Sequence, residues 1–152
     1  MKNITTKRNN VFVDSSILIA AILSPVGGSF YVLMELKDKF EFKINEYVFE
    51  EVFRILDTKF ISKPELKTEL FLIIGIANIE IFKNPLLAQV KKAEKFINRD
   101  DAPILAGSME SCSFLLTLDN HFLSKNMLEF ATKNNINILK PKEFIEQYRN
   151  CK

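Results

Sequence analysis

The sequence predicts a single-domain α/β protein, a three-layer α/β/α sandwich built around a mostly parallel sheet of about five strands. Short apolar runs of strand-forming residues alternate along the chain with longer segments of helical periodicity. The 152 residues suit one domain with one substantial core, and no linker or internal repeat divides them. Strands that alternate with helices run parallel, with helices on both faces of the sheet and right-handed connections.

The first half of the chain begins with a loose polar segment, residues 1–10, and a strand at 11–14. The continuous apolar run of this strand is typical of burial on both faces. A helix over 15–23 follows and ends where the next proline stops it. Ser29 is the expected N-cap of a helix that runs to about Lys39.

Residues 40–44 alternate apolar and polar side chains, which predicts a strand with one exposed side or an edge position. Pro103 fits the first turn of a later helix, because its missing N–H would lack a partner there anyway. The remaining helices are expected at 46–58, 64–76, 87–98, 100–112, 120–134 and 141–149, and the remaining strands at 79–81, 114–118 and 137–139.

Charge and cysteine content leave the function class open. A net charge of +2 is compatible with a nucleic-acid partner but does not establish one. Cys112 and Cys151 form neither a disulfide framework nor a zinc motif, so a reduced cytoplasmic protein is expected. The polar start does not resemble a signal peptide, and no apolar run reaches the roughly 18–20 residues of a membrane span. We therefore expect no membrane association.

Four acidic side chains are the candidate site residues: Asp14, Glu51, Asp101 and Asp119. Asp14 and Asp119 each follow a buried strand, and Glu51 lies early in the helix after the second strand. Strand ends and the helix starts that follow them meet at one edge of a parallel sheet, so these three are expected together. Asp101 is placed less firmly, because a full helix separates it from its strand.

Carboxylates that meet in one place raise one another's pKa, and burial adds to this effect. A divalent cation removes the conflict, and oxygen ligands alone favour Mg²⁺ or Mn²⁺ over zinc or copper. Such an ion activates water and offsets negative charge on a phosphate. The pattern therefore predicts metal-dependent hydrolysis of a phosphodiester bond.

Each acid also has a simpler structural interpretation. Asp14 and Asp101 could cap helices, Asp119 could start a turn, and Glu51 could be a solvated helix residue. The interpretation as a shared site depends on the coherent positions of all four residues along the chain.

Polar residues beside the strand-end acids extend the candidate site. The hydroxyls of Ser15, Ser16 and Thr117 suit hydrogen bonds to the carboxylates or to metal-bound water, although ordinary caps and turns explain them equally well. His121 is the only histidine and lies two residues after Asp119. It could contact phosphate or transfer a proton, but a surface-loop histidine without a role is the commoner case.

Four motifs follow one another along the chain: Val11-Phe12-Val13-Asp14-Ser15-Ser16, Glu51-Val52-Phe53-Arg54, Asp100-Asp101-Ala102-Pro103-Ile104-Leu105-Ala106 and Leu116-Thr117-Leu118-Asp119. No single motif is specific, but their order and spacing together resemble the PIN-domain ribonucleases, especially the toxins of VapBC-type toxin–antitoxin systems. The resemblance covers roughly residues 10–146.

The resemblance implies the PIN fold, cleavage of single-stranded RNA, a homodimer and an antitoxin that blocks the site. It also implies Mg²⁺ or Mn²⁺, with Asp14, Glu51, Asp101 and Asp119 as metal-site residues. From their positions, Asp14 and Asp119 would hold the metal, directly or through water, and Asp101 would be a third ligand. Glu51 would position or deprotonate the attacking water. The four acids Asp14, Glu51, Asp101 and Asp119 would then be the catalytic residues.

Some positions depart from the family's pattern. Ser16 replaces the usual Asn, Asn98 stands where relatives often carry another acid, and Asp100 could share or take the role of Asp101. The main alternative function is a non-catalytic binding module that keeps the fold. A phosphotransfer domain fits less well, because haloacid dehalogenase-like phosphatases need a second Asp where this chain has Ser16.

Overall fold

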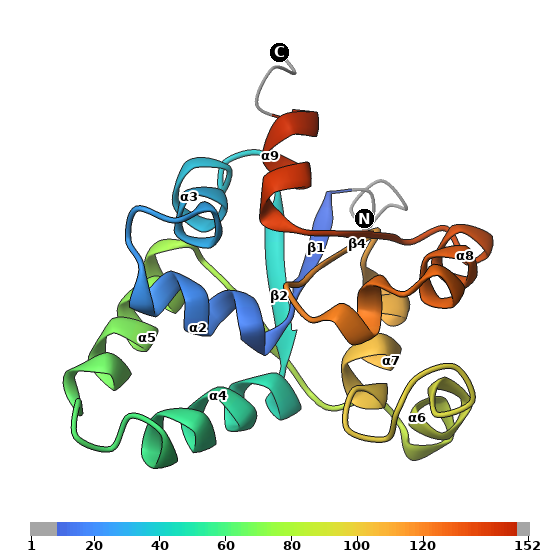
Figure 1. Cartoon of the computed structure of the whole chain (residues 1–152), viewed down its shortest axis with the longest axis horizontal. Helices are drawn as coiled ribbons and strands as arrows, with labels where there is room; N and C mark the ends of the chain where they lie inside the picture. The colour runs from blue at the N-terminus through green and yellow to red at the C-terminus, as the bar shows by residue number, and fades with distance from the viewer. Residues whose placement is uncertain (1–8, 149–152) are drawn as a thin grey trace, which may run out of the picture.

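A five-stranded parallel sheet forms the centre of the structure, a computed structural model that describes residues 9–148 (Figure 1). The strand order is β3-β2-β1-β4-β5, and every strand pairing is parallel. The expected three-layer sandwich with about five strands is confirmed. Expectations about residues 1–8, Arg149 and Cys151 lie outside the described residues. The strands are β1 Asn10–Val13, β2 Glu41–Asn45, β3 Glu80–Phe82, β4 Phe114–Leu116 and β5 Asn137–Leu139.

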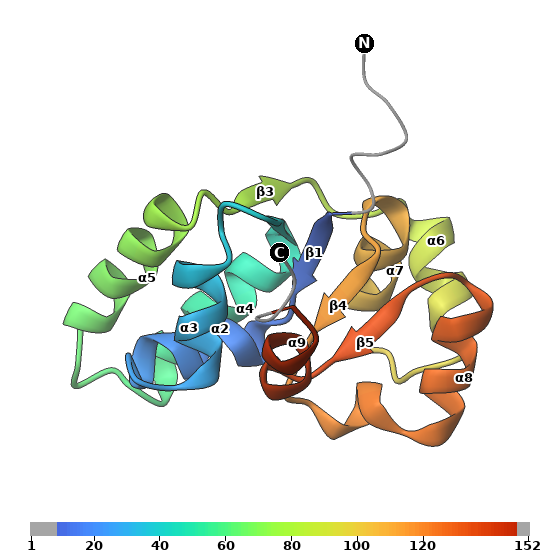
Figure 2. The same cartoon turned by 90° about the horizontal axis from the view of Figure 1, so that it is seen from above.

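The helices cover both faces of this sheet. Figures 1 and 2 show α2, α3 and α5 on one side of the sheet and α6, α7 and α8 on the other. The helices are α2 Ser15–Leu23, α3 Gly28–Glu35, α4 Glu46–Thr58, α5 Glu65–Ile76, α6 Leu87–Ala93, α7 Ala102–Ser111, the 3₁₀-helix η1 Asn120–Leu123, α8 Lys125–Lys133 and α9 Pro141–Tyr148.

The register of β1 and β4 sets the geometry of their carboxyl ends. Both strands are buried along their whole length, as their continuous apolar runs predict. Val13 pairs with Leu116, so the two strands end at the same level. The backbone N–H of Asp14 then donates to the carbonyl oxygen of Leu116 at 3.0 Å. The residues that follow each strand are therefore brought side by side.

The expected position of β2 was wrong. This strand lies between β1 and β3, and only its first residue is exposed. The alternating pattern comes from Lys43, whose buried side chain forms ion pairs with Glu80 on β3 and with Glu41 at 3.5 Å. A polar residue that finds acidic partners inside the structure produces the same pattern as one that faces solvent.

Three helix boundaries also differ from the expected ones. Gly27, not Ser29, is the N-cap of α3, and the chain turns at Leu36, whose carbonyl oxygen accepts the N–H groups of Lys39 and Phe40. The helix expected over 87–98 ends at Ala93 and continues as turns. The segment 120–134 is two helices, because Ser124 begins a new one: its hydroxyl accepts the N–H of Met127 at 3.2 Å.

Within residues 9–148, no single helix is long and apolar enough to cross a membrane. Helices α2 and α3 reach that length and composition only as a pair, with a bend of 99° between them. Both helices bury apolar residues in the protein core, among them Ile17, Leu18, Val32 and Leu33.

Candidate active site

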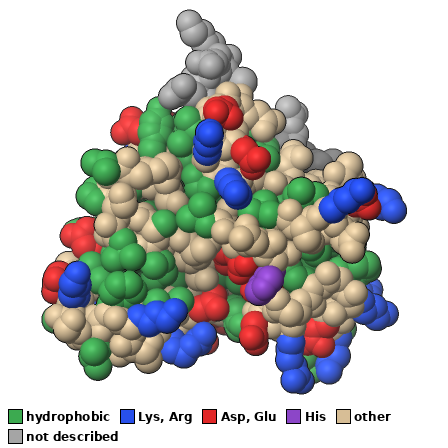
Figure 3. Space-filling model, in the orientation of Figure 1, with side chains coloured by type: hydrophobic (Ala, Val, Ile, Leu, Met, Phe, Trp, Pro, Cys, Tyr) green, Lys and Arg blue, Asp and Glu red, His purple; other side chains and the backbone are tan. Residues whose placement is uncertain are grey.

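The four acidic residues named from the sequence line one cleft of about 480 Å³. Asp14 and Asp119 follow β1 and β4, Glu51 lies in α4, and Asp101 directly precedes α7. Figure 3 shows acidic side chains gathered beside the histidine in a hollow of this face. The structure thus brings together the three acids that sheet topology placed at one edge, and it adds Asp101, whose position the topology left open.

Asp14 is the most enclosed of these acids, with 3% of its surface exposed. Its Oδ1 accepts the backbone N–H of Ser15 at 2.8 Å. Its Oδ2 accepts hydrogen bonds from the hydroxyls of Ser16 and Thr117, each at 2.7 Å. Asp14 therefore caps α2, as the simpler interpretation predicted. Its second oxygen, Oδ2, is bound by two side-chain hydroxyls that take no part in this cap.

Burial raises the pKa of Asp14 from 3.8 to about 6. The hydroxyl donors of Ser16 and Thr117 act in the opposite direction, since they stabilise the carboxylate. The negative charges of Glu51 and Asp119 raise the pKa further. Burial and the nearby negative charges thus disfavour the ionised form of Asp14, and a nearby cation would stabilise it.

Two hydroxyls connect the ends of β1 and β4. The Thr117 oxygen that donates to Asp14 also accepts the N–H of Asp119 at 2.9 Å. The Ser16 oxygen in turn accepts the N–H of Leu118 at 3.0 Å. These side chains lie where the sequence placed supporting hydroxyls, and they fix the strand-end acids relative to each other.

Glu51 reaches the cleft from the second turn of α4. Asn45 caps this helix, because its Oδ1 accepts the N–H of Val48 at 3.0 Å. The Ser15 hydroxyl donates to Glu51 Oε1 at 2.7 Å, and Arg54 lies 3.9 Å from Oε2. The N-terminal turn of α2 therefore orients Glu51. Ser15 donates its hydroxyl hydrogen to Glu51 and its backbone N–H to Asp14.

Asp101 occupies the N-cap position of α7 but its carboxylate makes no capping bond. Asn98 holds it instead: Nδ2 donates to Asp101 Oδ2 at 2.8 Å, and Oδ1 accepts the N–H of Asp101 at 3.0 Å. The pKa of Asp101 is raised, mainly by burial and also by the negative charge of Asp119. The hydrogen bond from Asn98 and the neighbouring His121 act in the opposite direction and lower this pKa. Asn98, noted from the sequence only as a missing acid, is thus the residue that positions Asp101.

Asp100 lies apart from this cleft. Its side chain is exposed, it does not line the cleft, and its carbonyl oxygen accepts the Tyr47 hydroxyl at 2.7 Å. Of the two neighbouring acids, Asp101 is the one that faces Asp119.

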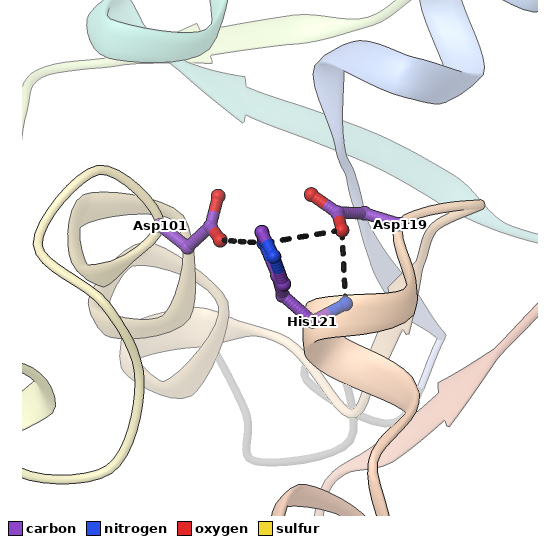
Figure 4. A group of neighbouring side chains, drawn as sticks. All are labelled: Asp101, Asp119 and His121. Carbon is purple, nitrogen blue, oxygen red and sulfur yellow. Dashed lines mark hydrogen bonds and ion pairs between the residues drawn. The ribbon is translucent and has the colours of Figure 1, made fainter.

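The ring of His121 lies between Asp101 and Asp119 (Figure 4). Its Nδ1 is 3.1 Å from Asp101 Oδ2 and 3.4 Å from Asp119 Oδ1. Asp119 Oδ1 also accepts the backbone N–H of His121 at 2.9 Å, which folds the chain back onto the carboxylate. The side chain is exposed, as a loop residue would be, but it is not isolated from the acids. An Asp followed two residues later by His at a turn is the sequence signal for this arrangement.

Asn45 was also missed from the sequence. Besides capping α4, its Nδ2 donates to the carbonyl oxygen of Pro103 in the first turn of α7 at 3.2 Å. Asn45 therefore joins the helix that carries Glu51 to the helix that follows Asp101. A polar residue directly before a predicted helix is a capping signal, but the second bond depends on tertiary packing.

The donor atoms present fit a divalent cation. One ligand atom each from Asp101, Asp119 and His121 lies within 4.8 Å of the others, and Asp14 and Glu51 border the same cleft. Carboxylate oxygens are the donors that Mg²⁺ and Mn²⁺ favour, and a cation in the cleft would stabilise the ionised form of Asp14, which burial and the nearby acids disfavour.

Comparison with protein families gives a match over most of the chain. A family model described as PIN domain matches residues 12–141. The chain belongs to the PIN-domain family. No curated protein matches it significantly.

Solved structures show the same fold as this PIN domain. VapBC2 from Rickettsia felis, bound to a DNA fragment from its promoter, is 15% identical with a TM-score of 0.64, over 86% of this chain and 98% of that chain. PAE2754 from Pyrobaculum aerophilum is 18% identical with a TM-score of 0.59, over 91% of this chain and 88% of that chain.

Proposed function

We propose that this PIN domain is a metal-dependent endoribonuclease and the toxin of a toxin–antitoxin pair. One observation carries the proposal: carboxylates from four separate elements, Asp14, Glu51, Asp101 and Asp119, line a single cleft. Bringing these carboxylates together destabilises the folded protein through desolvation and like-charge repulsion. A bound cation that acts on a phosphate substrate would offset this cost and explain the arrangement. Membership of the PIN-domain family supports the same conclusion.

In the proposed site Asp14, Asp101 and Asp119 hold Mg²⁺ or Mn²⁺. Bound there, the ion offsets negative charge on the phosphate and lowers the pKa of water. Glu51, oriented by the Ser15 hydroxyl, accepts the proton of the attacking water. Ser16 and Thr117 keep Asp14 fixed, so that its carboxylate needs no rearrangement when the ion and the substrate bind.

The cleft continues beyond the acids in a way that suits single-stranded RNA. Lys59 and Phe60 line it together with Ile19 and Ile55. A lysine can contact a backbone phosphate, and an aromatic ring can stack on an unpaired base. We infer an RNA strand that runs from the acids toward this wall.

The proposal includes a homodimer, a separate antitoxin chain and action in the cytoplasm, where RNA substrates are found. The fold shared with the VapBC2 structure supports an antitoxin partner. Large apolar side chains exposed on and before α5 suit contacts with another protein chain. They are Ile61 at 74%, Phe71 at 55%, Leu72 at 50% and Ile76 at 52% exposure.

The test is cleavage of single-stranded RNA by the purified, metal-free protein after addition of Mg²⁺ or Mn²⁺. We expect cleavage by the wild type, its loss on chelation, and its loss in Asp14→Asn. Asp100→Asn is the matched control, because it removes an exposed acid outside the cleft, and it is expected to cleave normally. An unchanged rate in Asp14→Asn would refute the proposal. A folded wild type that cuts no RNA with either metal would instead favour a binding module.

A further inference from the structure

We propose that His121 is a nitrogen ligand of the metal, and that this ligand makes the site prefer Mn²⁺ to Mg²⁺. The inference rests on the proposed function and adds to it a residue outside the four acids. It changes the expected all-oxygen site into a mixed site, in which the imidazole of His121 joins the carboxylates, beside Asp101 and Asp119.

The spacing of the three donor atoms fits one shared ion. A small octahedral dication lies roughly 2.1 Å from its ligands, so neighbouring ligand atoms are roughly 3 Å apart. His121 Nδ1 lies 3.1 Å from Asp101 Oδ2 and 3.4 Å from Asp119 Oδ1. Figure 4 shows the ring nitrogen directed toward both carboxylates. All three donor atoms lie within 4.8 Å of one another, close enough to approach one shared ion.

The hydrogen bonds of Asn98 determine which of its side-chain atoms faces the imidazole. Asn98 Oδ1 accepts the backbone N–H of Asp101, which fixes the orientation of the amide. Nδ2 must then be the atom that lies 2.8 Å from Asp101 Oδ2 and 3.2 Å from His121 Nδ1. Because Nδ2 is a donor, the tautomer of His121 with a lone pair on Nδ1 can accept from it, and this lone pair is the one that a metal ion would bind.

In this tautomer three acceptor atoms lie close together: Nδ1 of His121, Oδ2 of Asp101 and Oδ1 of Asp119. Without a positive charge between them their lone pairs repel. A divalent cation turns this repulsion into three coordinate bonds. The bond from the His121 backbone N–H to Asp119 Oδ1 already holds the backbone of His121 beside this carboxylate.

The imidazole sets the choice of metal. Magnesium favours carboxylate, carbonyl and water oxygens, whereas imidazole nitrogen binds transition-metal ions better. Mn²⁺ accepts carboxylates and imidazole together. A site with one nitrogen among carboxylates therefore discriminates against Mg²⁺ more than a site built from acids alone.

The chain offers an unusually direct test, because His121 is its only histidine. Pulsed electron paramagnetic resonance on Mn²⁺-loaded protein, prepared without a histidine tag, detects nitrogen nuclei bonded to the ion. The wild type is expected to show an imidazole ¹⁴N coupling, which can come only from His121. The coupling is expected to vanish in His121→Gln and in His121→Ala.

Metal affinities give a second readout that is independent of catalysis. Calorimetric titration of Mn²⁺ and Mg²⁺ is expected to show tighter Mn²⁺ binding in the wild type. His121→Gln is expected to lower Mn²⁺ affinity roughly tenfold or more and Mg²⁺ affinity by less. The side chain is 66% exposed, so the variants are expected to unfold at the temperature of the metal-free wild type.

The outcomes separate this inference from the proposed function. Wild-type protein that binds Mn²⁺ and cleaves RNA, yet shows no ¹⁴N coupling, overturns the role of His121 and leaves the nuclease. An unchanged ratio of Mn²⁺ to Mg²⁺ affinity in His121→Gln overturns the metal preference. Protein that neither binds Mn²⁺ nor cleaves RNA overturns both proposals together.

Discussion

The Thr117 hydroxyl donates to Asp14 Oδ2 at 2.7 Å, a hydrogen bond between residues 103 positions apart in the chain. The same oxygen accepts the N–H of Asp119 at 2.9 Å. Thr117 is fully buried, so water cannot replace either partner. The Thr117 hydroxyl thus bonds to both strand-end acids and helps to fix their relative position.

Thr117→Val removes this hydroxyl while keeping the shape of the side chain. We expect a loss of about 1–3 kcal/mol in the free energy of unfolding, because Asp14 loses a donor and the Asp119 N–H loses its acceptor. Urea denaturation at neutral pH measures it. Thr117→Ser keeps the hydroxyl and is the control. A valine variant as stable as the wild type, with the same Mn²⁺ affinity, would contradict the role given to Thr117.

The raised pKa of Asp14 predicts how stability varies with pH in the absence of metal. The folded state holds this proton more tightly than the unfolded chain, whose pKa is near 3.8. The group therefore adds stability below about pH 4 and loses it as the pH rises through about 6, a change of roughly 3 kcal/mol. Asp101, whose pKa is also raised, acts in the same direction.

This pH dependence is measured by urea unfolding from pH 4 to pH 7 in a chelating buffer, for the wild type and Asp14→Asn. The variant lacks the titrating group, so its stability relative to the wild type is expected to rise with pH. Saturating Mn²⁺ is expected to restore the wild type and leave the variant unaffected. A difference between the two proteins that stays constant over this range would show that Asp14 is not perturbed as described.

Glu51 and Glu50 provide a matched pair for catalysis. Glu51 borders the cleft and accepts the Ser15 hydroxyl, whereas its neighbour Glu50 is exposed on α4. Glu51→Gln is expected to lower the RNA cleavage rate by roughly 100-fold or more, because the proton acceptor is lost. Glu50→Gln is expected to change it little. Equal rates in the two variants, at saturating metal, would remove Glu51 from the mechanism.

Gly107 permits the close contact between α7 and Asn45. A Cβ atom at this position would lie 2.7 Å from Asn45 Nδ2 and 3.0 Å from Phe12 Cε2. Gly107→Ala is therefore expected to cost about 1–3 kcal/mol of stability and to disturb the bond from Asn45 to Pro103. Gly75→Ala, in α5, meets nothing within 4 Å and is expected to stabilise by up to about 1 kcal/mol. Thermal unfolding that ranks the two variants in the opposite order would contradict this account.

Sequence order alone predicted the parallel sheet with helices on both faces and the proximity of three of the acids, although not the position of β2 in that sheet. Asp14 and Asp119 meet because parallel strands present their carboxyl ends at one edge, a rule that needs only the alternation of strands and helices. This rule does not predict the position of Asp101, which depends on how α7 packs against β1 and β2. Tertiary packing, not local pattern, brings it to Asp119.

The polar contacts were the least predictable part. The alternation around Lys43 indicated solvent exposure, yet the side chain is buried because Glu80 on the next strand offers an acid. His121 looked isolated in the sequence, since the Asn98 and Asp101 that hold its ring precede it by 23 and 20 residues. Hydrogen bonds between distant segments leave no periodic signal in a single sequence.

The central claim is that acids from distant segments form one site that holds a divalent cation. Titration of Mn²⁺ into metal-free protein, followed by calorimetry, tests it most directly. We predict saturable binding by the wild type, retained in Asp100→Asn and lost in Asp14→Asn and Asp119→Asn. No binding by folded wild-type protein, or equal binding by all four proteins, would contradict the claim.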